Sequence, residues 1–461
     1  MPISENVLSE LRAVLGERLS TGESERALHG ASETFHRAPP PDAVAFPVDT
    51  GEVSAILKIC NAHGVPVIGW GTGTSLEGHA LAIHGGLVVD LMRMDRVLEI
   101  RPEDMLAVVQ PGVTRAALNT ELRATGLMFP IDPGANASLG GMAATRASGT
   151  TAVRYGTMRQ NVLALEVVLA DGRVIRTGTR AAKSSAGYDL TALMVGSEGT
   201  LGIITELTLR LYGQPEDISA AVCAFPTLTE AVTCVAQTMQ MGIPMARIEF
   251  MNPLAMRAIN LELGVERYPE KPHLLVEFTG SPDSVRADAE AFGVVVAENH
   301  GEGFEWASDR DDRNRLWAAR HASYTASLKL RPGATGVVTD ICVPMSELPG
   351  AVAAAAADME EAGIFGNIVG HVGDGNFHTL MLVEPGNEAE IADAKRIARR
   401  MAERALKVGG TISGEHGVGI GKLDLMRDQH GEDAIAAMQA IKRALDPSNI
   451  MNPGKLVPGM D

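Results

Sequence analysis

The chain has 461 residues, of which 45% are hydrophobic and 21% are charged, as is usual for globular proteins. This length exceeds what one hydrophobic core usually organises, so we expect two large units with smaller appendages. The net charge of −17 argues against a protein that binds nucleic acid through a basic surface.

The N-terminal segment, residues 1–41, is predicted to be helical and to end at Pro39, Pro40 and Pro41. Its apolar residues are interleaved with charges, which is typical of an amphipathic helix. Arg12 and Arg18 are too few for a transit peptide. No stretch of the sequence predicts a transmembrane segment.

Residues 42–213 are predicted to form the next domain, because strand-like runs alternate there with glycine-rich loops. The predicted strands are 65–68, 86–91, 107–110, 163–169 and 201–211.

The first glycine-rich loop, residues 71–75, follows the strand at 65–68 and reads Gly-Thr-Gly-Thr-Ser. Successive backbone N–H groups in such a turn can bind a phosphate or pyrophosphate. The loop is not a Rossmann fingerprint, since Leu76 replaces the third glycine and the next strand starts too soon for a crossover helix. We therefore predict a diphosphate held by a β-loop-β unit, with a plain glycine hairpin as the alternative.

Two further glycine-rich segments lie at 129–143 and 195–204, and residues 146–158 connect to the first of them. Each offers backbone donors and small residues along which a flat, extended cofactor could lie. Such dense glycine costs conformational entropy on folding, and a bound ligand would compensate for it.

Residues 214–445 are predicted to form a second domain of alternating strands and helices, starting at Gln214-Pro215-Glu216. Its predicted strands include 220–224, 247–250, 273–277 and 336–343. Residues 446–461 form a tail. Arg320 lies on a helical segment, where its guanidinium could bind a carboxylate through a bidentate fork. The alternative for Arg320 is an ordinary surface position.

The most informative pattern is the pair His371 and His378, which flank a predicted hairpin turn at residues 373–376. Facing residues of a hairpin point to one face, so two imidazoles could share a divalent ion. A predicted helix over 391–405 ends at Gly409-Gly410, and a predicted strand at 411–413 leads to Glu415 and His416. Two histidines and a glutamate with an open position are typical of a catalytic metal site. The alternative is that the histidines cap turns and the Glu-His pair lies on the surface.

These motifs together resemble the FAD-linked D-2-hydroxyacid dehydrogenases of the vanillyl-alcohol oxidase and para-cresol methylhydroxylase flavoprotein family, and most of all their cytochrome-linked, D-lactate-oxidising branch. The likeness runs from about residue 40 to 457. The matching strings begin at Asp132 (DPGA), Gly141 (GMAAT), Ala152 (AVRYGTMR), Val195 (VGSEGTLG), Leu316 (LWAARH), Asp340 (DICVP) and Gly370 (GHVGDGNFH).

The resemblance implies an α+β fold, with a two-subdomain FAD-binding domain of the para-cresol methylhydroxylase type at 42–213. It implies a cap domain at 214–445 with an antiparallel sheet flanked by helices, and a tail at 446–461 that returns to the flavin. The positions that match flavin-binding residues of the family are Gly71, Thr72, Gly73, Thr74, Ser75, Gly78, Pro133, Gly134, Gly140, Gly141, Ser148, Tyr155, Gly156, Glu198, Gly199, Ile204 and Asn452. Thr74 stands where some relatives attach FAD to a histidine, which implies non-covalent FAD, although His79 is nearby.

The resemblance also implies a divalent metal on His371, His378 and Glu415, a catalytic base at His416, and a carboxylate-binding Arg320. This ligand set suits zinc, manganese or iron. The relatives that oxidise 2-hydroxyglutarate carry Lys and Asn where this chain has Val338 and Leu380, and Thr where it has Tyr324. A distal carboxylate would therefore be buried without a charged partner, so we expect small or apolar monocarboxylic substrates, with D-lactate foremost.

The expected partners are a D-2-hydroxyacid and an electron acceptor, which is cytochrome c, a quinone or an electron-transfer flavoprotein; a homodimer is also considered. Cys60, Cys223, Cys234 and Cys342 lie far apart without a Cys-x-x-Cys pair, which predicts reduced thiols. We accordingly expect a cytoplasmic location, with peripheral association to the respiratory membrane as a variant. Two rival functions remain: a glycolate-oxidising flavin subunit, and a flavin- or metal-binding homologue without redox activity.

Overall fold

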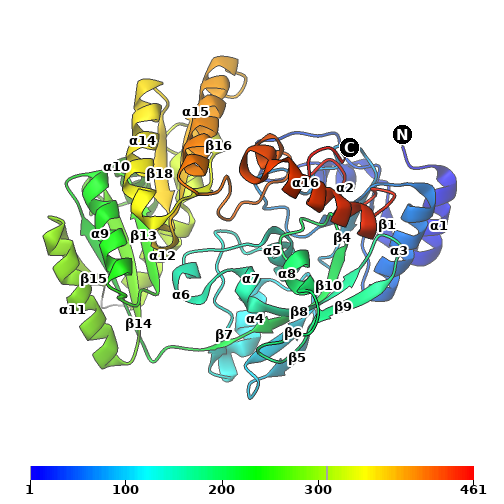
Figure 1. Ribbon diagram of the computed structural model, residues 1–461, viewed down its shortest axis with the longest axis horizontal. Coiled ribbons are helices and arrows are strands. Elements are labelled where there is room, and N and C mark those ends of the chain that lie inside the picture. The colour runs from blue at the N-terminus through cyan, green and yellow to red at the C-terminus, as the bar shows by residue number, and fades with distance from the viewer. Residues whose placement is uncertain (1, 308–309, 461) are drawn as a thin grey trace. The chain divides into compact units, whose positions relative to one another are not determined.

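The computed structural model describes residues 2–307 and 310–460, which divide into two compact units. The first unit comprises Met1–Ser148, Gly156–Gln214 and Glu415–Asp461, and the second comprises Gly149–Tyr155 and Pro215–Gly414. Each unit combines helices with sheets, which confirms the predicted α+β class (Figure 1). Within the described ranges, no helix is both long and apolar enough to cross a membrane.

The described residues of the first unit form two larger sheets and a two-stranded antiparallel sheet of β7 and β11. In one, β2, β4 and β3 run parallel in the order β1-β2-β4-β3; the other is antiparallel in the order β5-β6-β10-β8-β9. The strands are β1 (Leu19–Ser20), β2 (Ala43–Ala45), β3 (Val67–Trp70), β4 (Leu87–Asp90), β5 (Val97–Arg101), β6 (Leu106–Val109), β7 (Leu127–Met128), β8 (Val162–Val168), β9 (Val174–Gly178), β10 (Ile203–Arg210) and β11 (Tyr212–Gly213). The helices are α1 (Glu5–Leu15), α2 (Glu23–Leu28), α3 (Thr50–His63), α4 (Arg115–Glu121), α5 (Leu139–Thr145), α7 (Met158–Asn161), α8 (Leu190–Met194) and α16 (Met426–Leu445).

Helix α3 shows how the sequence builds this unit. Its first turn is capped by the Asp49 carboxylate, which accepts from the Glu52 N–H, and it ends at Gly64, whose φ of +65° favours glycine. One face of α3 packs into the core with α1 and the parallel sheet. The residues of that face are Val53, Ile56, Leu57 and Cys60.

Strands β3 and β4 are parallel neighbours, and the loop between them contains no helix. The predicted absence of a crossover helix is thus confirmed. The C-terminal tail runs beside β3: the Val67 N–H donates to Ile450 O at 2.7 Å, and the Asn452 N–H donates to Val67 O at 2.8 Å. Residues far apart in the chain are therefore held next to the loop that follows β3.

The second unit contains one antiparallel sheet. Its order in the described residues is β15-β12-β14-β13-β18-β19-β16, and β17 also pairs with β19. The strands are β12 (Asp217–Ala224), β13 (Arg247–Met251), β14 (His273–Gly280), β15 (Glu302–Ala307), β16 (Thr335–Val338), β17 (Ile341–Cys342), β18 (Gly366–Gly370) and β19 (Asn376–Val383).

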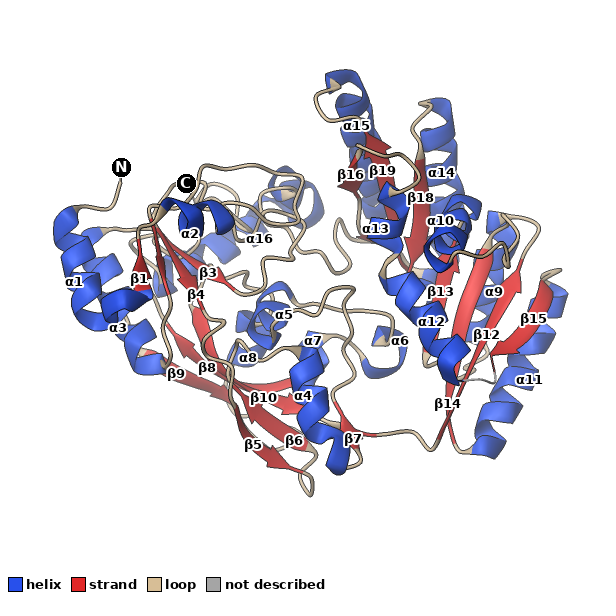
Figure 2. Ribbon diagram, turned by 180° about the vertical axis from the view of Figure 1, so that it is seen from behind, coloured by secondary structure: helices blue, strands red, loops and turns tan. Residues whose placement is uncertain are grey.

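Helices cover both faces of this sheet, as Figures 1 and 2 show from opposite sides. This explains why every residue of β19 is buried, including those between its apolar positions. One group consists of α9 (Leu228–Gln240), α11 (Pro282–Glu298), α14 (Leu348–Glu361) and α15 (Glu388–Lys407). The other consists of α10 (Pro253–Leu263), α12 (Arg310–His321) and α13 (Ser323–Leu328), and a short helix, α6 (Ala152–Tyr155), also belongs to the unit.

The division between the units differs from the domain plan expected from the sequence. The boundary between the two units lies between Gln214 and Pro215, where the sequence predicts it, but the second unit ends at Gly414 rather than near residue 445. Helix α16 belongs to the first unit because the buried Lys442 Nζ donates to Thr200 O at 2.9 Å and to Met451 O at 2.8 Å.

The predicted hairpin around the histidines exists, since β18 and β19 pair antiparallel. Its connection is a 3₁₀ turn, Val372–Asp374, closed by Gly375 at φ +83°. The predicted strand at 411–413 is wrong: Thr411 makes only an isolated bridge with Cys342. The chain turns away there because Ser413 binds a side chain of the second unit, the Asp340 carboxylate, instead of continuing a ladder.

Candidate active site

His371 and His378 lie close together in the second unit. Their ring centroids are 5.4 Å apart at 79°, and a nitrogen of each ring lies within 4.8 Å of the other. They are not directly opposite in the hairpin, because the register pairs His378 with Val369. His371 follows the end of β18 and reaches His378 from the turn. The sequence therefore predicts the pairing correctly but not its geometry.

Glu249 on β13 joins two of the predicted site residues, and sequence reasoning missed it. Its side chain is 0% exposed; one oxygen accepts from His371 Nδ1 at 2.7 Å and the other lies 2.6 Å from Arg320 Nη2. Arg320 itself is buried, and its Nη1 donates to Ser323 Oγ at 3.3 Å. The only signal in the sequence is a glutamate inside a strand that is otherwise apolar at its centre, a place where an unpaired charge is rare.

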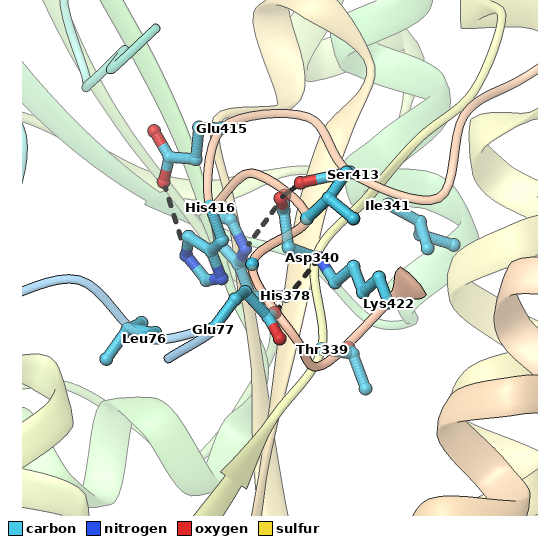
Figure 3. Close-up of polar contacts among 12 residues, drawn as sticks. Leu76, Glu77, Thr339, Asp340, Ile341, His378, Ser413, Glu415, His416 and Lys422 are labelled. Atoms are coloured by element: carbon cyan, nitrogen blue, oxygen red, sulfur yellow. Dashed lines mark hydrogen bonds and ion pairs between the residues drawn. The ribbon is translucent and has the colours of Figure 1, made fainter. Parts of the chain in front are cut away.

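Asp340 lies beside His378 and was also missed as a site residue. It is buried, and its Oδ1 lies 3.5 Å from His378 Nδ1. Ser413 Oγ donates to Asp340 at 2.7 Å and Asn376 Nδ2 donates at 2.8 Å, and Figure 3 shows Asp340 between Ser413 and His378. The His371 imidazole is thus hydrogen-bonded to a carboxylate through Nδ1, an arrangement that fixes the tautomer of a metal-binding histidine and leaves Nε2 for the ion, whereas His378 only has a carboxylate 3.5 Å from its Nδ1.

Glu415 and His416 begin the last part of the first unit, directly after Gly414. Both side chains are largely buried, and His416 Nε2 lies 3.8 Å from Glu415 Oε1 (Figure 3). The predicted catalytic and metal-binding residues are therefore divided between the units: Arg320, His371 and His378 belong to the second, and Glu415 and His416 to the first.

Several of the predicted flavin-binding residues lie in or next to the loop after β3 in the first unit. Gly71 touches Ser138, because a Cβ at Gly71 would overlap Ser138 Oγ. That hydroxyl is buried and has no hydrogen-bond partner among the described residues. Gly73 and Gly78 adopt φ values of +70° and +76°, which expose backbone N–H groups in a manner only glycine tolerates easily. A buried unpaired hydroxyl beside a glycine loop fits a bound diphosphate.

Asn452 in the tail connects two further flavin-matched segments. Its Nδ2 donates to His79 O at 3.0 Å and to Glu198 O at 2.7 Å. Its Oδ1 accepts from Lys455 Nζ at 2.6 Å, and burial lowers the pKa of Lys455 to about 7. The tail is thus built into the site rather than appended to it.

The other flavin-matched positions differ in how far the structure brings them together. Gly140 and Gly141 lie in the first turn of α5, and Ser148 follows this helix. The hydroxyls of Thr72 and Thr74 lie 3.1 Å apart, and Ile204 is buried on β10. In contrast, Tyr155 belongs to the second unit while Gly156 belongs to the first. The loop positions are Thr72, Thr74, Ser75, Pro133, Gly134, Gly156 and Gly199.

Comparison with known proteins identifies both halves of the chain. Residues 41–178 match the FAD binding domain family, and residues 214–456 match the family of FAD linked oxidases, C-terminal domain. Among solved structures, p-cresol methylhydroxylase superposes with a TM-score of 0.79 at 18% identity, covering 99% of this chain and 98% of that chain. This likeness confirms the predicted fold.

Curated relatives cover nearly the whole chain. A probable mitochondrial D-lactate dehydrogenase of Danio rerio is 49% identical over 98% of this chain and 92% of its own length. The mitochondrial D-lactate dehydrogenase (cytochrome) of Arabidopsis thaliana is 42% identical, over 99% and 81%. Glycolate oxidase subunit GlcD of Escherichia coli (strain K12) is 33% identical, over 91% and 84%.

The expected cytoplasmic location is wrong by this comparison, since these D-lactate dehydrogenases are named as mitochondrial. The four cysteines are free, but reduced thiols indicate only a reducing compartment and do not say which one. The matches over both halves, together with the fold, show that the chain belongs to the FAD-linked oxidases and, within the para-cresol methylhydroxylase type of flavoprotein, to the D-2-hydroxyacid dehydrogenases.

Proposed function

We propose that the protein oxidises a small D-2-hydroxyacid, with D-lactate foremost, to the 2-oxoacid and uses non-covalent FAD. The observation that carries this proposal is the buried group in which Glu249 joins Arg320 to His371, with His378 beside it. This group can hold an anion with a polarised hydroxyl. The names of the relatives, D-lactate dehydrogenases at 37 to 49% identity, support the same substrate class.

Arg320 binds the substrate carboxylate in this proposal. Both of its terminal nitrogens are engaged, Nη2 by Glu249 and Nη1 by Ser323, whereas its buried Nε has no hydrogen-bond partner among the described residues. A buried donor without a partner is costly, so a carboxylate oxygen at this position would relieve that cost as well as pair the charge. The neighbouring Glu249 keeps the arginine from being an uncompensated buried cation in the free enzyme.

His371, His378 and Glu415 would hold a divalent metal ion. The support is the donor chemistry: the His371 imidazole is hydrogen-bonded to Glu249 through Nδ1, which leaves its Nε2 for the ion, and a nitrogen of His378 lies within 4.8 Å of a nitrogen of His371. A bound ion would act as a Lewis acid on the substrate hydroxyl and lower its pKa, as it does for bound water. Zinc, manganese and iron all suit such ligands.

His416 would accept the proton of the substrate hydroxyl, and FAD, when bound, would supply the chemistry that accepts a hydride equivalent from C2. The loss of one proton and one hydride from the hydroxyacid leaves the 2-oxoacid, so the charge balances. Flavin binding would rest on the residues after β3, on Ser138, Gly199 and Asn452, and on the main chain at Glu198. Their support is the shared location in the first unit and the unpaired Ser138 hydroxyl.

Three side chains favour a small substrate tail. Val338 on β16 lies directly opposite Leu380 on β19, and a Cβ at Gly336 would overlap Leu380 and approach Tyr324 Cε2 at 3.2 Å. Leu380 lies two positions after His378 on β19, so the two side chains point to the same face of the sheet. Val338 and Tyr324 pack next to Leu380 on that face. None of the three offers a positive charge for a second carboxylate.

The electron acceptor would be cytochrome c, a quinone or an electron-transfer flavoprotein. Three of the relatives carry "cytochrome" in their names, which supports the first of these. Turnover assays with each acceptor would decide between them. A homodimer stays a prediction, for which light scattering of the purified holoenzyme is the test.

The proposed function is tested by anaerobic mixing of the holoenzyme with D-lactate, L-lactate and glycolate while the absorbance of oxidised flavin is followed. We expect rapid bleaching by D-lactate, slower bleaching by glycolate and none by L-lactate. Faster reduction by glycolate would favour the glycolate-oxidising rival. A yellow protein that no 2-hydroxyacid bleaches would favour the homologue without redox activity.

A further inference from the structure

The loop that follows His416 is held by two buried glutamates of its own unit. This segment, the 417–422 loop, reads Gly-Val-Gly-Ile-Gly-Lys. The N–H groups of Val418 and Gly419 donate to the two oxygens of Glu198 at 2.7 and 2.8 Å. The backbone oxygen of Glu77 accepts from the Ile420 N–H at 2.9 Å.

The second glutamate also holds the end of the loop by an ion pair. Lys422 Nζ lies 3.1 Å from Glu77 Oε1, and both side chains are at least nine-tenths buried (Figure 3). His36 Nε2 lies 4.0 Å from the other oxygen of the same carboxylate. The 417–422 loop is therefore fixed at both ends by buried, charged groups.

The alternating glycines of the loop are required by this attachment. A Cβ at Gly417 would lie 2.6 Å from His79 Nε2 and 2.7 Å from Glu198 Oε1. A Cβ at Gly419 would overlap Glu77 O, and one at Gly421 would overlap Glu77 Oε2. The Gly-x-Gly-x-Gly pattern thus brings the backbone directly against both glutamates.

Glu198 is itself held in a costly conformation. Its φ is +54°, a strained region that non-glycine residues rarely adopt. Its carbonyl oxygen accepts from Asn452, and its carboxylate lies 3.3 Å from the His79 imidazole. Burial raises the pKa of Glu198, but His79 and the two backbone donors outweigh burial and hold that pKa below its usual range. An ionised carboxylate is the form that can accept both N–H groups.

We infer that Glu198 and Glu77 are positioning residues, which fix the 417–422 loop and so set the place of the His416 imidazole relative to the FAD-binding loops of the same unit. This inference rests on the proposed role of His416 as the base. It also gives Glu198 a different part from the one suggested by sequence resemblance, since its carboxylate serves the loop that carries the base. A base displaced by about 1 Å can lose about 100-fold in rate.

The test is Glu198→Gln in the holoenzyme, with Glu166→Gln as the matched control. The amide that E198Q introduces can accept from one loop N–H through its oxygen, but its NH₂ group cannot accept from the other. Glu166 is also a buried carboxylate of the first unit, but it binds Thr50, Thr205 and Arg176, away from the loop. We expect E198Q to retain FAD and to reduce it with D-lactate about 100-fold more slowly, with little change in KM, while E166Q keeps the wild-type rate.

Hydrogen exchange separates positioning from a general loss of structure. In E198Q the amides of Val418 and Gly419 should exchange faster, while peptides from β8 and β10 keep their protection. Wild-type exchange at these amides together with a wild-type reduction rate would overturn the inference. If wild-type enzyme is not reduced by any D-2-hydroxyacid, the proposed function fails instead. Gly419→Ala provides a second route should E198Q not fold: it should lower the rate through overlap with Glu77, and an unchanged rate would also count against the inference.

Discussion

Replacing Glu249 by glutamine tests whether one buried carboxylate organises both the metal-binding and the substrate-binding side chains. In the wild type this carboxylate accepts from His371 Nδ1 and pairs with Arg320. The amide that E249Q introduces has nearly the same shape but offers one acceptor and one donor. One of the two partners must therefore face a donor, and Arg320 loses its counter-charge while it stays buried.

The size of the effect follows from these contacts. Removing one partner of a buried ion pair costs about 3–5 kcal/mol, and the hydrogen bond that the new amide retains places E249Q near the lower figure. For a unit of this size a loss of about 3 kcal/mol lowers Tm by roughly 6–12 °C. Loss of a carboxylate that orients a metal-binding histidine weakens metal affinity by about 10- to 100-fold.

The assay is calorimetric titration of metal-free protein with zinc and manganese, combined with thermal unfolding of the same samples. Glu277→Gln is the matched control, since Glu277 is buried on the adjacent strand β14 and lies 3.4 Å from Arg247. E277Q should lose stability but bind metal as the wild type does. If E249Q binds metal with wild-type affinity, the assignment of Glu249 to the site is wrong.

Three further predictions concern other parts of the chain. Burial lowers the pKa of His29, but its bonds to Asp90 and a backbone carbonyl outweigh burial and raise that pKa above the ordinary value. The stabilisation of the folded state by His29 is therefore full below about pH 6.5 and is lost as pH rises through the folded pKa. The difference in urea unfolding between wild type and His29→Gln should accordingly be larger at pH 6 than at pH 9. The double variant Val338→Lys with Leu380→Asn should raise kcat/KM for D-2-hydroxyglutarate relative to D-lactate, and an unchanged ratio would show that these positions do not set specificity. Burial is the largest of the effects that raise the pKa of Cys342 to about 12. This thiol should therefore resist iodoacetamide at pH 8 in the native protein and react once the protein is unfolded. Rapid labelling of Cys342 in the native protein would contradict the structure.

Much of the fold could be predicted because local patterns and tertiary structure agree. The helix at 391–405 appears as α15, since its apolar spacing matches a buried face and Gly409 supplies the left-handed turn after it. The strand before the glycine loop and the hairpin of β18 and β19 were equally predictable. What local pattern could not give is pairing: the parallel neighbours β3 and β4, and the attachment of α16 to the first unit, depend on residues far apart in the chain.

The candidate site was predictable where residue type alone implies chemistry, as with His371, His378 and the glycines after β3. Glu249 and Asp340 were missed because each is a single acidic residue in or beside a strand, and only folding places it against an imidazole. Thr411 and Ile412 indicate a strand because β-branched residues favour one, yet the hydroxyl of Ser413 donates to Asp340. The role of Glu198 was hidden for the same reason, since its loop partners lie more than 200 positions away.

The most direct test of the central claim is a single-turnover experiment on FAD- and metal-loaded wild type and Arg320→Met, mixed anaerobically with D-lactate. The proposed function predicts fast bleaching of the wild-type flavin, and in the variant a loss of substrate saturation with the flavin still bound. Bleaching of the variant at the wild-type rate and with the wild-type concentration dependence would contradict the assignment of Arg320 and its neighbouring histidines as the hydroxyacid site.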